Sequence, residues 1–392
     1  MERLYFDWAA TSKPDPEILE QTVRDAIDFY GNPSSSHSEG KKASELLSTC
    51  RKKVATELNC KAEQIIFTSG GTESNNLIIF SLLNRRRQAG EILISGFEHA
   101  AVYEPAKSLK DLGWKLNILP PLKEGAIDPD SLIKAYTIGT EFISLMAVNN
   151  ETGVILPVRE SVGNLRQSAE NAGKEVFIHT DGVQALGKQK IDLTAWDVDA
   201  ASFSGHKIGA PRGCGILFLK NPKAMLNRGG GQEMGLRGGT ENLPGIHGLS
   251  LAIEKKYANL ETDLEHAKEI KRFIVNNLIE RANAKIIPTR DKALSEGYSP
   301  WIVMVSFPQI PGEVLARVIN DKGAAVSTGS ACSSRQKKTF RVSDSLGISR
   351  DIAFSAIRIS WGADTSLVEC EALIKIFENE VELLRRVTGR RR

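Results

Sequence analysis

The string Ser202-Phe203-Ser204-Gly205-His206-Lys207 narrows the fold more than any other stretch of the chain. It extends the apolar pair Ala200-Ala201 and ends in a lysine, and an earlier apolar run ends in a similar way at Asp181. Ligands of open parallel sheets gather at the carboxyl ends of strands, so we expect both side chains at one edge of a sheet. This amine and carboxylate fit pyridoxal phosphate (PLP), because the amine forms a Schiff base with the aldehyde and the acid keeps the pyridinium nitrogen protonated.

Each of these two residues also has a simpler interpretation when it is considered alone. A lone lysine is usually a solvated surface residue, and an aspartate after a strand often caps the next helix. The small and polar residues Ser204, Gly205 and His206 surround Lys207 at the end of a predicted strand. Together with Asp181, this context favours the cofactor site over both simpler interpretations.

Short apolar runs alternate with helical patterns through the first part of the chain. The runs are Ile65-Ile66-Phe67, Ile92-Leu93-Ile94, Leu116 to Leu119, Phe142 to Met146, Val176-Phe177-Ile178, Ala200 to Phe203 and Gly215 to Leu219. Strands of this length separated by helices predict a mostly parallel sheet that is covered on both faces. Apolar residues at helical spacing also predict an amphipathic helix over Ser38–Leu58.

A domain boundary is expected after the glycine-rich stretch from Gly229 to Gly239, where a long helical pattern runs from Pro244 toward Ile279. Beyond it the sequence predicts strands at 302–306, near 324–327 and at 357–360, and helices over 312–321 and 366–386. A chain of 392 residues is too long for one ordinary core. We therefore predict an α/β protein with a large domain over 12–250, whose mostly parallel central sheet is flanked by helices, and a smaller α+β domain over 1–11 and 251–392.

Composition limits the class of protein further. With 41% hydrophobic and 25% charged residues and a formal charge of +3, the chain has the composition of a globular protein and none of the strong basic excess that direct nucleic-acid binding needs. No apolar stretch is long enough to span a membrane and no leader pattern follows Met1, so we expect a cytoplasmic protein. Five scattered cysteines without ligand spacing predict free thiols and no metal site.

Two further strings follow predicted strands in the first half of the chain. Gly71 and Thr72 belong to a Gly-Gly-Thr turn that opens a helix, where free N–H groups and the helix dipole favour an anion such as the cofactor phosphate. An ordinary capped turn is the alternative. His99 follows another strand; alone it suggests a structural hydrogen bond, whereas in a cofactor cleft it would stack on the ring and move protons.

The second half of the chain contributes a cysteine and an arginine. Cys332 lies among small polar residues and before Arg335, Lys337 and Lys338, surroundings that lower a thiol pKa and favour the nucleophilic thiolate. An inert loop cysteine is the alternative. Arg358 alternates with apolar neighbours within a predicted strand and needs a carboxylate, either from the protein or from a substrate.

Together these strings resemble the cysteine desulfurases of the NifS/IscS type, in the class V branch of fold-type I PLP-dependent enzymes. The resemblance covers nearly the whole chain. Besides the strings above it rests on Tyr5-Phe6-Asp7-Trp8-Ala9-Ala10-Thr11, Gly31-Asn32-Pro33-Ser34-Ser35, Val148-Asn149-Asn150-Glu151-Thr152-Gly153 and Arg237-Gly238-Gly239-Thr240.

The resemblance implies a role for each site residue in a PLP-dependent homodimer. Lys207, Cys332 and His99 would be catalytic, as the Schiff-base lysine, the nucleophile, and the residue that stacks on the ring and transfers protons. Cofactor binding would involve Asp181 at the pyridinium nitrogen, Gln184 and Asn150 around the ring oxygen, and Gly71, Thr72, Ser204 and His206 at the phosphate, with Thr240 reaching across from the second subunit. Arg358 would bind the substrate carboxylate, with Asn150 and Asn32 as further substrate contacts.

The implied reaction removes sulfur from L-cysteine, releases L-alanine and leaves a persulfide on Cys332. A sulfur-acceptor protein is then implied, such as an iron–sulfur scaffold or a tRNA-thiolation protein. Three alternatives stay open: a selenocysteine lyase, a PLP-dependent aminotransferase on the same fold, and a non-catalytic scaffold. The intact lysine, aspartate and cysteine argue against the scaffold, and the cysteine string argues against an aminotransferase.

The chain departs from the family pattern in three places. Gln336-Lys337-Lys338-Thr339 stands where many relatives have Leu-Glu-Pro-Ser, which bears on the choice of acceptor. Gly209-Ala210 and Gly182-Val183 replace Tyr-Gly and Ala-Thr at the pocket wall. None of these changes removes a required group.

Overall fold

The computed structural model describes residues 3–85, 88–122, 125–171, 173–222, 230–328 and 341–389. Its main element is a seven-stranded sheet in the spatial order β2-β8-β7-β6-β5-β3-β4. The strands are β2 (Ile65–Thr68), β3 (Glu91–Ser95), β4 (Lys115–Leu119), β5 (Thr140–Ser144), β6 (Phe177–Asp181), β7 (Ala200–Ser204) and β8 (Gly215–Leu219). Only β8 runs antiparallel to its neighbours, so the predicted mostly parallel sheet is confirmed.

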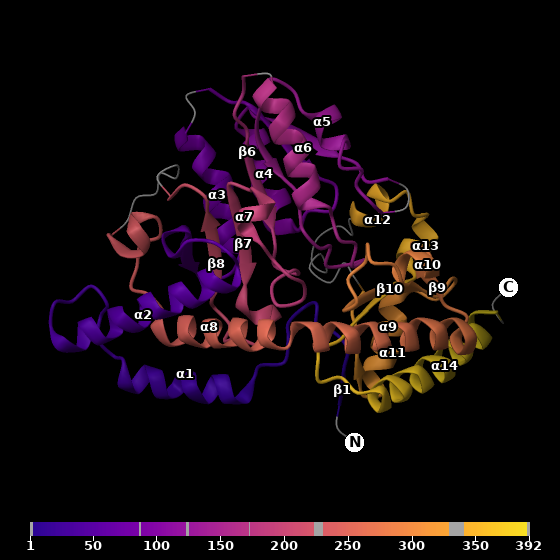
Figure 1. Ribbon diagram of the computed structural model, residues 1–392. Coiled ribbons are helices and arrows are strands. Elements are labelled where there is room, and N and C mark those ends of the chain that lie inside the picture. The colour runs from indigo at the N-terminus through magenta and orange to yellow at the C-terminus, as the bar shows by residue number, and fades with distance from the viewer. Residues whose placement is uncertain are drawn as a thin grey trace.

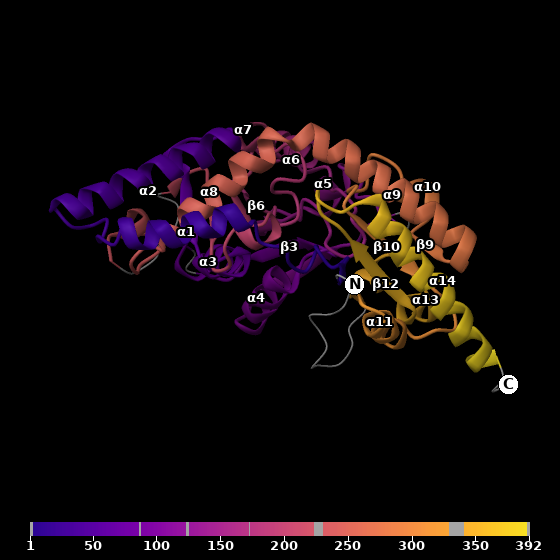
Figure 2. The same cartoon turned by 90° about the horizontal axis from the view of Figure 1, so that it is seen from below.

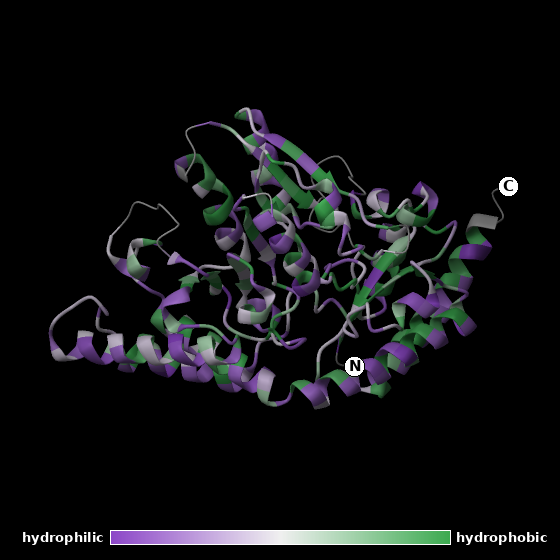
Figure 3. Ribbon diagram, turned by 45° about the horizontal axis from the view of Figure 1, so that its top comes forward, coloured by the Kyte–Doolittle hydropathy of each residue, from purple (hydrophilic) through white to green (hydrophobic). Residues whose placement is uncertain are grey.

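Helices cover both faces of this sheet, which is why its strands are nearly continuous apolar runs. Successive residues of a strand point to opposite faces: Ile66 of β2 packs with α3 (Gly71–Arg85) and α4 (Ala100–Asp111), whereas Ile65 and Phe67 belong to the core on the other side. That second core includes α2 (Ser38–Glu57), α6 (Val158–Asn171), α7 (Leu193–Trp196) and α8 (Leu243–Ala258). α1 (Pro16–Asp28) packs against α8, and the short α5 (Ser131–Ala135) against α6. Figure 3 shows hydrophobic residues concentrated in the strands, with hydrophilic residues along the outer helices.

A smaller unit lies at the other end of the molecule (Figure 1). Its antiparallel sheet has the order β12 (Ala356–Ser360), β10 (Ile302–Ser306), β9 (Lys285–Ile287), and β1 (Leu4–Tyr5) pairs in parallel with β11 (Ala324–Ala325). The helices of this unit are α9 (Leu260–Ala282), α10 (Arg290–Ala293), α11 (Gly312–Asp321), α12 (Arg341–Ser345), α13 (Arg350–Phe354) and α14 (Leu367–Gly389).

The N-terminal segment belongs to the core of this smaller unit. Phe6 and Trp8 are buried in one cluster with Trp361 and Phe377, more than 350 residues later in the chain. This packing agrees with the predicted union of 1–11 with 251–392. Tyr298, Val342 and Leu346 pack in the large core instead, so the division from 12–250 stays a proposal.

The long helical pattern that follows Pro244 forms two helices instead of one. α8 and α9 meet at Asn259, which closes α8 and precedes α9. Its side-chain amide donates to the carbonyl of Lys255, and its backbone leaves helical geometry with φ −108° and ψ 7°. Figures 1 and 2 show α8 and α9 following one another along the molecule, so α9 connects the large sheet to the smaller unit. In the described part of the chain, no helix has the length and apolar content needed to cross a membrane.

Candidate active site

Lys207 lies directly beyond the carboxyl end of β7, in the short helix η2 (Gly205–Lys207). Its Nζ donates hydrogen bonds to the carbonyl oxygens of Ala9 at 2.6 Å and Ala10 at 2.7 Å. The N-terminal segment is tied to the same turn, because Ser12 N–H donates to the His206 carbonyl at 2.9 Å. The part-buried lysine thus lies between the large sheet and the chain segment that enters the smaller unit.

Asp181 occupies the last position of β6, and its register partner on β7 is Ser202. The carboxylate is only 3% exposed and accepts hydrogen bonds from Asn75 Nδ2 at 2.8 Å and from Val183 N–H at 3.0 Å. Neighbouring parallel strands therefore carry the predicted acid and lysine to the same edge of the sheet. Asn75, on the first turns of α3, is a site residue that the sequence analysis missed.

The predicted phosphate turn connects β2 to α3, which begins at Gly71 as expected. A side chain on Gly215 would place its Cβ 2.5 Å from the Gly70 Cα, so this close approach of two backbones requires glycine. A Cβ on Gly71 would lie 3.8 Å from the Ser204 Cβ. The turn, the exposed Thr72 and Ser204 are thus brought together at the end of α3 where an anion is favoured.

Two histidines lie near Lys207, and both have a lowered pKa, which favours the neutral ring. His99 caps α4, with Nδ1 accepting a hydrogen bond from Ala101 N–H at 3.1 Å, so the neutral ring carries its proton on Nε2. Burial lowers the His99 pKa, and the nearby Asp181 charge opposes that shift. The His206 ring bonds Thr11 at 3.2 Å, and burial together with Lys207 lowers its pKa to about 4.

Glu98, next to His99, is a second residue that the sequence analysis passed over. Its side chain is fully buried, with Oε1 accepting from Ser95 Oγ and from Met146 N–H, both at 2.7 Å. Its Oε2 is buried without a hydrogen-bond partner in the described structure. Burial, with the Asp181 charge adding, raises the Glu98 pKa to about 7.

Arg358 on β12 has a carboxylate partner within the protein. Its NH2 donates to Asp7 Oδ1 at 2.7 Å and its NH1 to the Asn150 carbonyl at 2.9 Å. The guanidinium is buried, and its Nε has no hydrogen-bond partner among the described residues. Arg358 therefore does have a carboxylate partner from the protein, Asp7. Binding of a substrate carboxylate by the same arginine stays a prediction.

Gln184 is buried, and its Nε2 donates to the same Ala9 carbonyl that Lys207 bonds. Asn150 reaches the site through its backbone carbonyl on Arg358. Asn32 and Thr240 are exposed. Asn32 accepts from Ser34 N–H in the α1–α2 connection, at the end of the molecule away from the smaller unit in Figure 1. The roles of these two residues stay predictions.

Cys332 lies outside the described residues. Of the cysteines that the structure describes, Cys50, Cys214 and Cys370 are buried and Cys60 is half-buried. Burial raises the pKa of Cys60 and Cys370 to about 12 and that of Cys214 to about 11. These thiols are poor nucleophiles at neutral pH because the thiolate is the reactive form. Among the described residues no cluster of His, Cys, Asp or Glu forms a metal site.

Described residues on both sides of the Cys332 segment contact the site. Ser327 exchanges two backbone hydrogen bonds with Arg358, of 2.7 and 3.1 Å. Arg341 stacks over the ring of Tyr103, a residue of the helix that His99 caps, at 4.4 Å from the ring centroid. The described residues Ser327 and Arg341, which flank the segment that contains Cys332, therefore lie next to Arg358 and to the helix that His99 caps.

The Gly182 departure has a packing explanation. A Cβ at this position would lie 2.3 Å from Cε1 of Phe203, which fills the space beside the strand ends. Val183 retains a backbone hydrogen bond to Asp181. The pocket wall is therefore closed by Phe203, and the carboxylate keeps its position.

Comparison with known proteins gives matches over nearly the whole chain. The family model described as "Aminotransferase class-V" matches residues 4–373. "Cysteine desulfurase IscS" from Dictyoglomus turgidum is 33% identical over 389 residues, 98% of this chain and 96% of the relative. The "NifS/IcsS protein homolog" of Lactobacillus delbrueckii subsp. bulgaricus is 36% identical over 379 residues, 96% of each chain.

Solved structures agree with these sequence matches. A structure titled "NIFS-LIKE PROTEIN" superposes with a TM-score of 0.89 at 33% identity and covers 97% of this chain and 100% of its own. The NifS-like protein from Rickettsia africae superposes with a TM-score of 0.82 at 27% identity, covering 97% of this chain and 99% of its own.

Proposed function

Because this chain belongs to the class-V aminotransferase family and, within it, to the cysteine desulfurases of the NifS/IscS type, we propose that it removes sulfur from L-cysteine. The products are L-alanine and a persulfide on Cys332. The predicted fold, that of fold-type I PLP-dependent enzymes, is confirmed by this membership. The observation that carries the proposal is the placement of Asp181 and the Lys207 turn at the carboxyl ends of adjacent strands β6 and β7.

The residues at this edge fit PLP. The buried Asp181 carboxylate has two neutral donors as its hydrogen-bond partners, so a protonated ring nitrogen would supply the missing positive charge. The Lys207 amine donates to two backbone carbonyls. The α3 N-terminus with Ser204 and His206 would hold the phosphate, and His99 would lie on the ring.

When bound, PLP supplies an electrophilic aldehyde carbon and a ring that stores the electron pair released at the substrate Cα. Lys207 Nζ would hold the aldehyde carbon and would be the group that accepts the Cα proton. Asp181 holds the proton on the ring nitrogen. His99, neutral and protonated on Nε2, is suited to donate and accept a proton at that nitrogen.

Arg358 would bind the carboxylate of L-cysteine. Its Nε–H is buried and unpartnered in the described structure, and a carboxylate would accept from it. The ion pair between NH2 and Asp7 holds the guanidinium and fixes its plane. Asn150, whose carbonyl bonds NH1, keeps the loop between the two sheets against the same arginine.

Cys332 would accept the sulfur as its thiolate. The four described cysteines have raised pKa values, which leaves Cys332 in its basic surroundings as the best nucleophile. It is the fifth residue after Ser327, and a chain of five residues spans at most about 18 Å. Since Ser327 is bonded to Arg358, a segment of this length would allow the thiol to reach a substrate held there.

The finer assignments belong to the same proposal. The protein would act as a cytoplasmic homodimer, with Thr240 of one subunit near the phosphate of the other. The persulfide sulfur would pass to an acceptor protein such as an iron–sulfur scaffold or a tRNA-thiolation protein. A selenocysteine lyase is the competing activity, because a better leaving group would require less of Cys332.

The decisive experiment incubates the holoprotein with L-cysteine, measures alanine, and maps the persulfide by mass spectrometry. We expect alanine release with the modification on Cys332, and neither in Cys332→Ala. Cys60→Ala, which removes the half-buried described thiol, is the matched control and should behave as wild type. A persulfide on another cysteine would overturn the nucleophile, and alanine release from selenocysteine alone would overturn the desulfurase activity.

A further inference from the structure

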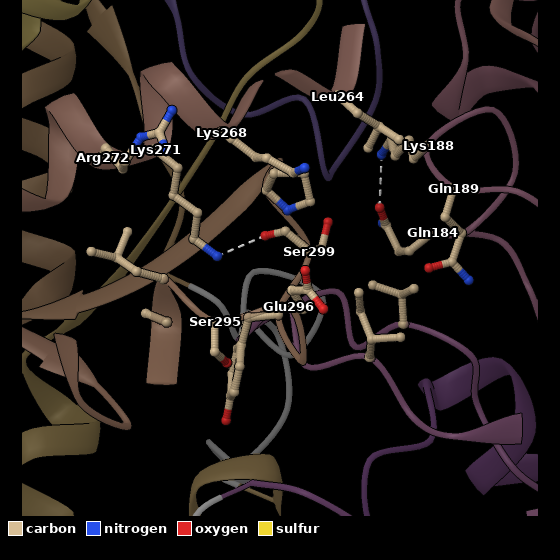
Figure 4. Close-up of a pocket in the computed structure, with 16 residues that line it drawn as sticks. Gln184, Lys188, Gln189, Leu264, Lys268, Lys271, Arg272, Ser295, Glu296 and Ser299 are labelled. Carbon is tan, nitrogen blue, oxygen red and sulfur yellow. Dashed lines mark hydrogen bonds between the residues drawn. The ribbon is translucent and has the colours of Figure 1, made fainter. Parts of the chain in front are cut away.

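A cavity of about 370 Å³ opens between the large sheet and the smaller unit, beside the first turns of α9. Figure 4 shows Lys268 and Lys271 entering from α9, and Gln184 with Lys188 from the segment that follows β6. Its volume lies in the range of small-molecule sites. Asp181, His99 and Lys207 are not among its lining residues, whereas Gln184 is, so the cavity adjoins the cofactor site without containing its lysine or acid.

The cavity carries an excess of positive charge. Its lining contains Lys188, Lys268, Lys271 and Arg272 but a single carboxylate, Glu296. Glu296 is exposed, as are Lys268 and Arg272. Lys268 is paired with Glu265 on the surface of α9 at 2.6 Å. The positive charge inside the cavity therefore comes from the two less exposed lysines, Lys188 and Lys271.

In the described part of the chain, these two lysines donate hydrogen bonds to neutral groups only. Lys271 is 3% exposed and donates to the Ser299 carbonyl at 2.7 Å. Its ammonium also lies 5.8 Å from the centroid of the Tyr298 ring. Lys188 donates to Gln184 Oε1 at 3.0 Å. Each ammonium has three N–H donors, so both retain donors for a ligand.

Burial makes the charged form of both lysines unfavourable. It lowers the pKa of Lys271 to about 7, and it lowers that of Lys188 to about 7 with the charges of Lys207, Lys256 and Arg358 adding to the shift. An anion between them would supply the counter-charge and favour the ammonium forms. Binding of such a ligand would therefore take up protons above pH 7.

The lining also has an apolar part. It includes Val148, Ile155, Leu264, Leu294 and Pro300. A hydrated inorganic ion would leave this surface without a partner, whereas an aliphatic or aromatic body would cover it. The chemistry of the lining thus combines one anionic group with an apolar body.

We propose that this cavity is a second ligand site, which binds a small organic carboxylate through Lys271 and Lys188 and buries the apolar body of the ligand against α9. The ligand would lie next to the active site, because Gln184 bonds both Lys188 and the Ala9 carbonyl that accepts from Lys207. Binding does not require turnover, so the proposal stands or fails separately from the proposed function.

Calorimetric titration of the holoprotein with benzoate, benzamide and acetate tests this site. Benzamide keeps the ring without the charge, and acetate keeps the charge without the ring. We expect benzoate to bind roughly ten-fold more tightly than either, about the effect of one charge-assisted hydrogen bond. Equal affinities for benzoate and benzamide would overturn the proposal.

Variants locate the binding. Lys271→Met removes a buried donor with little change of volume and should weaken benzoate binding roughly ten-fold; Lys188→Met is the second variant should the first fail to fold. Lys285→Met, at an exposed lysine outside the cavity, should bind as wild type. Binding that is lost in Arg358→Gln yet unchanged in both cavity variants would assign benzoate to the active site and overturn the proposal.

Discussion

The two sheets each bring a charged side chain to the candidate active site, and they hold it in different ways. Asp181, on the large sheet, is bonded by Asn75 and by the backbone of its own turn, all within the large half of the molecule. Arg358, on the small sheet, is bonded by Asp7 of the N-terminal segment and by the Asn150 carbonyl of the large half. The first position is fixed locally, whereas the second depends on how the two halves meet.

This difference matches what each group is proposed to do. A cofactor that stays bound through many turnovers needs a carboxylate held in one geometry, and the buried Asp181 network provides that. A substrate that enters and leaves needs a binding group whose contacts can change. Arg358 already bonds residues from separate parts of the chain, and its neighbour Ser327 leads toward Cys332.

The largest expected effect lies on the large-sheet side, at Lys207. Lys207→Ala removes both the amine that holds the cofactor and the base for the Cα proton, so we expect alanine release to fall by roughly 10⁴-fold. The absorbance of the enzyme-bound cofactor should change as well. Lys190→Ala, at an exposed lysine, is the control. An unchanged spectrum with normal turnover in Lys207→Ala would show that the site lies elsewhere.

On the small-sheet side, Arg358→Gln should act mainly on substrate binding. Loss of a buried charged donor to a carboxylate corresponds to roughly 10- to 100-fold in KM for L-cysteine, with a smaller change in kcat. Asp7→Asn keeps the guanidinium and removes only its internal counter-charge, so its effect on KM should be the weaker of the two. If Asp7→Asn raises KM as much as Arg358→Gln, the arginine acts through the ion pair and not on the substrate.

Sequence reasoning reached the strand-end residues because their positions follow from local patterns. Asp181, Lys207 and Arg358 each end or interrupt an apolar run, and parallel pairing then brings the first two together without further information. The family resemblance supplied the roles. It also implied site roles for Asn32 and Thr240, both of which are exposed in the single chain.

The residues that were missed come from other elements. Asn75 reaches Asp181 from a helix 106 residues away, and Asp7 reaches Arg358 across 351 residues. No local periodicity indicates such a pairing, because it depends on how the elements pack. The division of the helical pattern at Asn259 was missed for a related reason. α8 packs against the large core and α9 against the core of the smaller unit, and the segment's own sequence does not show where one packing ends and the other begins.

Asn75 allows a finer test of the large-sheet side. Asn75→Leu removes a donor from Asp181 at similar volume, so the carboxylate loses the Asn75 hydrogen bond and keeps the one from Val183 N–H. We expect kcat to fall roughly ten-fold and the affinity for the cofactor to weaken, the effect of one hydrogen bond to a charged group. Asn76→Leu is the matched control, since this neighbour bonds only the Thr72 carbonyl on the exposed side of α3. Equal effects of the two substitutions would mean that damage to α3, and not the Asp181 contact, is being measured.

The last expected effect concerns stability and pH, at Glu98. Its pKa is raised by burial from 4.5 to about 7 in the folded protein, so between these values the folded state holds a proton that the unfolded state has lost. The stability that this group contributes is complete below pH 4.5 and is lost as the pH rises through 7. Glu98→Gln keeps an acceptor for Ser95 and Met146 and cannot ionise. Urea unfolding at pH 5 and pH 8 should therefore show that the variant gains on wild type by about 2 kcal/mol over this interval. His99 and His206, whose pKa values are lowered, contribute the opposite slope in both proteins and cancel in the difference. A difference independent of pH would place the proton elsewhere in the cluster around Asp181.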